Sequence, residues 1–165
     1  MKTLFLLRHA KSSWDYPDLP DQERPLNARG KRDAPAMGQW INDHFPAPQL
    51  ILSSHSVRTL ATISKVAHAM GIRGEEIQTD ERLYHASTAT LFKVLKNAPD
   101  QAESLMLVGH NPGITDFANV LCPQQSVDNI PTCGFFVIRF HCSGWKEASP
   151  ENAEFVCFQY PKNLR

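Results

Sequence analysis

An apolar run near the amino terminus ends abruptly in a cation and an imidazole. The run is Thr3-Leu4-Phe5-Leu6-Leu7, which we interpret as a buried β-strand, and Arg8-His9-Ala10 follow it directly. Open α/β sheets place their ligand chemistry at the carboxyl ends of their strands. Arginine offers a planar fork of donors that matches phosphate oxygens, and a neutral histidine can attack phosphorus or accept a proton. This feature therefore predicts an α/β sheet with an anion site at the end of its first strand.

Two later segments have the same character. Ser53-Ser54-His55-Ser56-Val57-Arg58 follows a short apolar strand predicted over 50–52, and Gly109-His110-Asn111-Pro112-Gly113 follows a strand predicted over 104–108. The carboxyl ends of parallel strands meet at one edge of a sheet, where such sheets bind their ligands. We therefore expect the polar side chains at these three strand ends to converge.

Four candidate catalytic residues should meet at this edge: Arg8, His9, Arg58 and His110. Arg58 falls in the first turn of a predicted helix, where backbone N–H groups and the helix dipole also favour negative charge. Two guanidinium groups and two imidazoles around one phosphate suit phosphoryl transfer, because positioning and neutralising the equatorial oxygens is most of that catalytic task. Each residue taken alone is better explained as structural, for example as a strand-end ion pair or a hydrogen-bonded loop histidine. The four together, at equivalent strand ends, favour a functional site.

Strand and helix patterns alternate along most of the chain and predict a single domain over residues 1–165. The expected order is strand 3–8, loop 11–25, a helix from an Asn27 cap to about Phe45, strand 50–52, a helix from a Ser56 cap to Met70, weak strand 76–79, loop 81–87, helix 89–97, strand 104–108, helix 114–121, and strands 135–140 and 154–160. Pro35 inside the first helix predicts a kink or a late start. The last two strands, separated by a turn containing Gly144, suggest an antiparallel pair. The predicted fold class is α/β, a three-layer α/β/α sandwich whose central sheet is mostly parallel with an antiparallel edge.

Composition argues against several classes of function. The 17 basic and 17 acidic residues balance, so nothing indicates a nucleic-acid partner or a membrane surface. The four cysteines have no CxxC spacing, which argues against zinc and redox motifs and for reduced thiols. No segment approaches membrane-spanning length and no secretory leader is evident, so we expect a cytoplasmic protein. Nothing in the sequence indicates its oligomeric state.

Several motifs, in this order along the chain, resemble the histidine phosphatase superfamily, whose fold is phosphoglycerate-mutase-like. They are Leu7-Arg8-His9-Ala10, the Arg58 segment with Thr59 and Thr62, and Val108-Gly109-His110-Asn111. Residues 8–14, 24–30 and 109–113 are similar to the small SixA-type phosphohistidine phosphatases in particular. The resemblance runs from residue 1 to about 121, and the chain lacks the large insertions with which mutases and acid phosphatases cap their substrates.

This resemblance implies a mechanism that needs no metal or other cofactor. His9 is then the nucleophile and is transiently phosphorylated before water releases phosphate. Arg8, Arg58 and a protonated His110 bind the phosphoryl group, and their positive charge replaces that of a metal ion. A nucleophilic His9 must be neutral, which requires a hydrogen-bond acceptor at its other ring nitrogen. The sequence does not identify that acceptor.

The chain departs from the family pattern at the general acid. Many relatives carry Glu or Asp two residues after a leucine in the loop before the third helix, and here that leucine is Leu83 and the matching residue is His85. Glu81 lies just before the leucine, where it is better explained as an ordinary loop residue. A phosphohistidine has a P–N bond whose imidazole leaves readily once protonated, so a dedicated strong acid is less needed than for an alkoxide. The departure favours phosphohistidine over phosphomonoesters.

Three further residues are candidates for substrate binding. Lys11 and Ser12 begin the loop beside His9 and could touch the phosphoryl group or a substrate protein. His85, like Glu81, could be a general acid or an ordinary loop residue. The favoured partner is a protein that carries phosphohistidine.

The alternatives are a phosphatase of small phosphomonoesters and a non-catalytic module that binds phosphate or a phosphoprotein. A metallohydrolase is disfavoured, because the HxH or HxxxH spacing and the clustered carboxylates of such sites are missing.

Overall fold

A central sheet organises the protein. The computed structural model describes residues 1–164, and in that part of the chain the sheet has six strands in the order β3-β2-β4-β1-β5-β6. Their bounds are β1 (Lys2–Arg8), β2 (Leu50–Ser53), β3 (Ile77–Thr79), β4 (Ser104–Gly109), β5 (Phe135–Phe140) and β6 (Ala153–Gln159). The first four strands pair in parallel, whereas β5 runs antiparallel to both β1 and β6. The predicted fold class, a mostly parallel sheet with an antiparallel edge, is confirmed.

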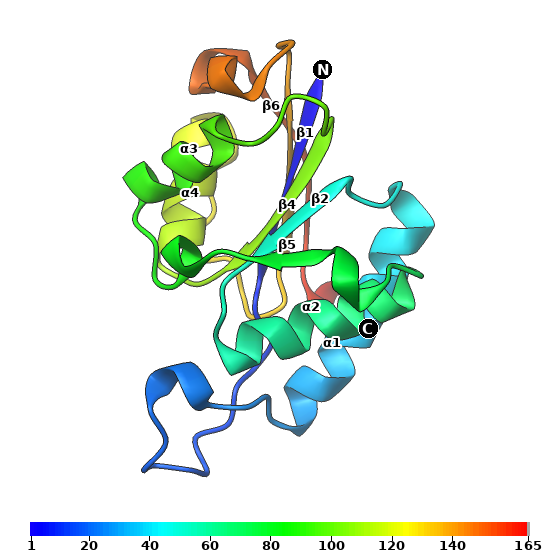
Figure 1. Ribbon diagram of the computed structural model, residues 1–165, viewed down its shortest axis with the longest axis vertical. Coiled ribbons are helices and arrows are strands. Elements are labelled where there is room, and N and C mark those ends of the chain that lie inside the picture. Colours follow the sequence, from blue (N-terminus) through cyan, green and yellow to red (C-terminus); the bar gives the residue numbers. More distant parts are fainter. Residues whose placement is uncertain (165) are drawn as a thin grey trace.

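Helices cover both faces of this sheet (Figure 1). One layer contains α1 (Ala28–His44) and α2 (Val57–Ala69), and the other contains α3 (Thr88–Lys96) and α4 (Gly113–Leu121). Successive residues of β1 point into different layers: Leu4 and Leu6 pack with α3 and α4, whereas Phe5 and Leu7 pack with α1 and α2. All four are nearly or fully inaccessible to solvent. The continuous apolar run of the sequence is thus explained by a strand that is buried on both faces.

Two predicted caps determine where the first two long helices begin. The Asn27 side chain accepts a hydrogen bond from the Gly30 amide at 2.9 Å, and the Ser56 hydroxyl accepts one from the Thr59 amide at 3.4 Å. The late start considered for the first helix is wrong, because α1 begins at Ala28 and continues past Pro35 to His44. Burial of its apolar face against α2 and the sheet outweighs the backbone hydrogen bond that proline removes. Within residues 1–164, no helix is both long and apolar enough to cross a membrane.

The connection between β5 and β6 is longer than a tight turn. It contains Gly144, as predicted, but it also forms two short 3-10 helices, Trp145–Glu147 and Pro150–Asn152. The Trp145 side chain is fully buried, and its indole N–H donates to the Ala102 carbonyl at 2.8 Å. This connection therefore contributes a large side chain to the core under α3 and α4.

Replacing Trp145 by alanine should lower the free energy of unfolding by about 3–5 kcal/mol, the usual cost of emptying a buried tryptophan site. Trp14 is the matched control, because it is 72% exposed and stacks on the Arg24 guanidinium. Trp14→Ala should cost less than about 1 kcal/mol, the worth of an exposed cation–π contact. Urea unfolding followed by far-UV circular dichroism measures both, and equal losses in the two variants would contradict the buried role of Trp145.

Candidate active site

The carboxyl ends of β1, β2 and β4 lie together at one edge of the sheet. Arg8 is paired with Gly109 in the parallel register of β1 and β4, and the His9 amide donates to the Gly109 carbonyl at 3.2 Å. The His9 and His110 rings consequently lie with their centroids 5.3 Å apart. In Figure 1 the loop after β1, coloured blue, extends from this same end of the sheet. The structure thus brings together the strand ends that the sequence pattern joined.

His9 is held with one ring nitrogen free to react. Its side chain is buried, and its Nδ1–H donates to the Ala10 carbonyl oxygen at 2.8 Å, so the lone pair is on Nε2. Burial, and after it the charges of Arg58 and Arg8, lowers the pKa of His9 to about 3. The ring is therefore neutral at physiological pH, in the tautomer that a nucleophile requires. The acceptor that the sequence could not identify is the backbone of the next residue.

Arg8 and Arg58 each present an unpaired donor in the buried part of the site. Arg58 is 2% exposed, and its terminal nitrogens donate to the Asp21 backbone oxygen at 2.6 Å and to Asp21 Oδ2 at 3.0 Å. Arg8 donates one terminal nitrogen to the Ile130 carbonyl at 3.0 Å. The Nε–H groups of both arginines are buried and have no acceptor within residues 1–164. Buried donors are rarely left unpaired, and an oxyanion placed between them would supply the missing acceptors.

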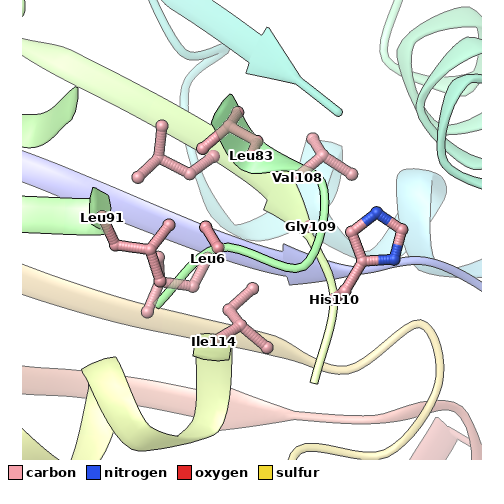
Figure 2. Close-up of a pocket in the computed structure, with 9 residues that line it drawn as sticks. Leu6, Leu83, Leu91, Val108, Gly109, His110 and Ile114 are labelled. Carbon is pink, nitrogen blue, oxygen red and sulfur yellow. The ribbon is translucent and has the colours of Figure 1, made fainter. Parts of the chain in front are cut away.

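His110 is neutral in this structure, whereas the resemblance implies an imidazolium when the phosphoryl group is bound. Its Nδ1 accepts from Arg58 at 3.3 Å, and its Nε2–H donates to Ser54 Oγ at 2.8 Å. Burial, followed by the neighbouring His9 and Arg58, lowers the pKa of His110 to about 2. His110 also borders a small apolar pocket lined largely by leucines and by Ile114, and Figure 2 shows its ring projecting away from those side chains. Both ring nitrogens of His110 are thus engaged, Nε2–H by Ser54 and Nδ1 by Arg58.

The candidate substrate-binding residues differ in their placement. His85 lies beside His110, with ring centroids 4.8 Å apart, and is 48% exposed at the mouth of the site. The Ser12 hydroxyl accepts from Arg24 Nη1 at 3.0 Å, so it is engaged in holding its own loop. The Lys11 ammonium group has no hydrogen-bond or ion-pair partner in residues 1–164, and no contact joins it to the cluster. Of the three, the structure brings only His85 to the four central residues.

Asp21 is the member of the cluster that sequence reasoning missed. Its Oδ2 atom accepts from Arg58 at 3.0 Å, from His85 Nε2 at 3.1 Å and from the Tyr84 hydroxyl. Partial burial raises the pKa of the Asp21 carboxyl, but the hydrogen bonds from Tyr84, His85 and Arg58 outweigh that effect and hold this pKa well below its usual range. The available signal was the three-residue spacing to Arg24, whose Nε contacts Asp21 Oδ1 at 3.2 Å. That signal is weak in a loop containing several acidic residues.

Comparisons with known sequences identify the family of the chain. The model of the histidine phosphatase superfamily (branch 1) matches residues 4–91. An uncharacterized protein of Mycobacterium tuberculosis is 33% identical over 166 residues, a match that covers 94% of this chain and 100% of that protein. The region that the family model matches contains Arg8, His9 and Arg58.

Solved structures match the whole fold. A protein of Agrobacterium tumefaciens assigned as the phosphohistidine phosphatase SixA is 26% identical, with a TM-score of 0.82 and coverage of 97% of this chain and 98% of that one. The protein histidine phosphatase SixA complexed with tungstate has a TM-score of 0.84 at 18% identity and covers 99% of each chain. A mycobacterial glucosyl-3-phosphoglycerate phosphatase matches with a TM-score of 0.65 at 14% identity, covering 96% of each chain. At such low identity the last two matches establish the fold alone.

The buried neutral histidines make stability depend on pH in a defined direction. The pKa of His9 is lowered from 6.5 to about 3, so between those values the unfolded chain binds a proton there that the folded protein does not. The free energy of unfolding should therefore fall as the pH is lowered from 6.5 to 5, by up to about 1.4 kcal/mol per pH unit for each such histidine. His9→Asn removes one of these protons and should flatten the slope by about that amount. Urea unfolding at a series of pH values measures the slope, and an unchanged slope in the variant would show that His9 is not buried in its neutral form.

Proposed function

Because this chain belongs to the histidine phosphatase superfamily, we propose that it is a metal-independent phosphatase that removes the phosphoryl group from phosphohistidine in a protein. One observation carries the proposal: a neutral His9 with a free Nε2 stands beside two arginines whose buried Nε–H groups lack acceptors. A nucleophile and an oxyanion site are thus combined at one sheet edge.

The proposed reaction has two displacements at phosphorus. His9 Nε2 attacks first, the P–N bond of the substrate breaks, and the released imidazole carries a proton. Water then attacks the phosphorylated His9, phosphate leaves, and the His9 lone pair is restored. In both steps Arg8, Arg58 and His110 hold the equatorial oxygens, where charge must be stabilised without reorganisation of the site.

Two observations support phosphohistidine as the substrate. His85 stands where many relatives carry a carboxylic acid, and a P–N bond depends less on a strong acid than a P–O bond does. The mouth of the site is open, because the Asp21 and His85 side chains are 43% and 48% exposed. A side chain on the surface of another protein could enter such a site. The assigned SixA protein at 26% identity is consistent with this substrate class.

A phosphatase of small phosphomonoesters is the second candidate. The fold match to glucosyl-3-phosphoglycerate phosphatase shows that this scaffold also hosts phosphosugar chemistry. Lys11, whose ammonium group is unpartnered within residues 1–164, could contact either a small phosphorylated molecule or a phosphoprotein. A module that only binds phosphate would use the same central residues without turnover.

Phosphate release tests these candidates directly. We expect the wild type to release phosphate from a phosphohistidine-containing protein with and without EDTA, and to label His9 when the substrate carries a radioactive phosphoryl group. His9→Ala should lose turnover by at least about 10³-fold, because the residue forms the covalent intermediate. His44→Ala, at the exposed end of α1, is the matched control and should retain activity.

Other outcomes would redirect the assignment. Release from a chromogenic phosphomonoester only would favour small metabolites as substrates. Phosphate binding without release from either substrate would indicate a binding module, and loss of activity in EDTA would refute the metal-independent mechanism.

A further inference from the structure

The proposed reaction needs a proton donor. At residue 85, where many relatives carry a carboxylic acid, this chain has a histidine. In a phosphorylated imidazole, the nitrogen bonded to phosphorus has no free lone pair. The proton that converts the ring into a neutral leaving group must therefore be taken up by the other ring nitrogen. A suitable acid lies at a distance from phosphorus, toward the outside of the site.

His85 occupies such a position. Its ring centroid lies 4.8 Å from that of His110, and the His110 centroid lies 5.3 Å from that of His9. The side chain is half-exposed at the mouth, where a leaving imidazole must exit. Histidine is also the side chain that exchanges protons most readily near neutral pH.

The contact with Asp21 gives the His85 ring a defined orientation. His85 Nε2–H donates to Asp21 Oδ2 at 3.1 Å, which leaves Nδ1 as the nitrogen that exchanges a proton with a substrate. The groups facing His85 are Asp21, Tyr84 and His110, and Arg58 reaches the same carboxylate oxygen at 3.0 Å. Among them only Asp21 is an anion, so it alone stabilises a protonated ring. The carboxylate remains ionised because its hydrogen bonds keep its pKa low.

We propose that Asp21 and His85 form a proton-transfer dyad in which His85 is the catalytic acid and Asp21 is the positioning residue. This proposal rests on the phosphohistidine phosphatase activity proposed above. In the first step, protonated His85 gives its Nδ1 proton to the far nitrogen of the substrate imidazole as the P–N bond breaks and the P–Nε2 bond to His9 forms. In the second step, water attacks phosphorus, the P–Nε2 bond to His9 breaks, and the proton that the water releases to solvent returns His85 to the protonated state.

The contact between Asp21 and Arg58 also allows a different role for Asp21, as a competitor of the phosphoryl group. Its carboxylate lies on Arg58, so it could compete with a phosphoryl group for that guanidinium. The arrangement favours the dyad, because the Nε–H groups of Arg8 and Arg58 remain unpaired while Asp21 is bound to the terminal nitrogens of Arg58. The oxyanion therefore does not need the donors that Asp21 occupies.

Two small substrates separate proton transfer from phosphoryl binding. N-phosphorylimidazole needs a proton to leave, whereas N-phosphoryl-N′-methylimidazolium carries a permanent positive charge and needs none. For Asp21→Asn and His85→Gln, single-turnover transfer from N-phosphorylimidazole to His9 at pH 8 should fall by about 100-fold, the lower range for loss of a general acid. Transfer from the methylated substrate should remain within a few-fold of wild type. The double variant should be no slower than the slower single variant, because both changes remove one proton transfer.

The pH dependence and a matched control complete the test. The deficit on N-phosphorylimidazole should shrink as the pH is lowered, because solvent then protonates the substrate ring. Glu23→Gln changes an exposed acidic residue in the same short helix and should behave as wild type on both substrates.

Three results would overturn the dyad while leaving the proposed function intact. The first is a wild-type rate in Asp21→Asn, and the second is an equal loss of rate on both substrates. The third is tighter binding of substrate or vanadate by Asp21→Asn with an unchanged single-turnover rate, which would show that Asp21 competes with the phosphoryl group for Arg58. Failure of the wild type to transfer a phosphoryl group from either substrate to His9 would instead refute the proposed function itself.

Discussion

Buried positive charge at the end of β1 is the constraint on which the rest of the site depends. Arg58 is 2% exposed, and burial together with Arg58 lowers the pKa of the nearby Arg8. Arginine side chains stay protonated even when they are buried. The Asp21 carboxylate and the backbone oxygens of Asp21 and Ile130 therefore offset the desolvation of these two positive charges. The histidines respond in the opposite way and remain neutral. The arginines thereby carry the positive charge, and the neutral His9 keeps the free Nε2 lone pair that the proposed nucleophile needs.

The scaffold holds these groups in register through a few coupled contacts. Thr62 on α2 accepts from the Ala10 amide at 2.8 Å and donates to the Arg58 carbonyl at 2.7 Å, so it joins the end of β1 to the helix that carries Arg58. From the other side, the Cys133 amide donates to the His9 carbonyl at 2.9 Å. Cys133 has φ 60°, an uncommon conformation for a non-glycine residue that the surrounding chain must stabilise. The backbone on either side of the His9 ring is thus fixed by α2 and by the segment before β5, and not by the ring's own contacts alone.

Features that depend on strand order and periodicity could be predicted from the sequence, whereas features that depend on side-chain contacts could not. The positions of Arg8 and His110 could be predicted, because each residue stands at the end of an apolar strand that is buried on both faces. The neutral state of His110 in this structure escaped prediction, because it results from burial and from the neighbouring His9 and Arg58. Asp21 escaped for a similar reason, since only folding of its loop distinguishes it from the other acidic residues beside it. Trp145 escaped as a core residue because its segment has no strand or helix periodicity.

The position of Asp21 suggests how one scaffold can be adapted to different leaving groups. An ester oxygen receives its proton at the atom bonded to phosphorus, so an acid for that reaction must lie close to the phosphoryl group. A phosphorylated imidazole receives its proton across the ring, and a carboxylate placed close to phosphorus would add negative charge beside the oxyanion without reaching the basic nitrogen. In this chain the carboxylate is that of Asp21, and in the proposed dyad the transferred proton is carried by His85, on the solvent side of that carboxylate. In the proposed dyad, the contact between the loops that carry Asp21 and His85 thus takes the place of a carboxylate at residue 85.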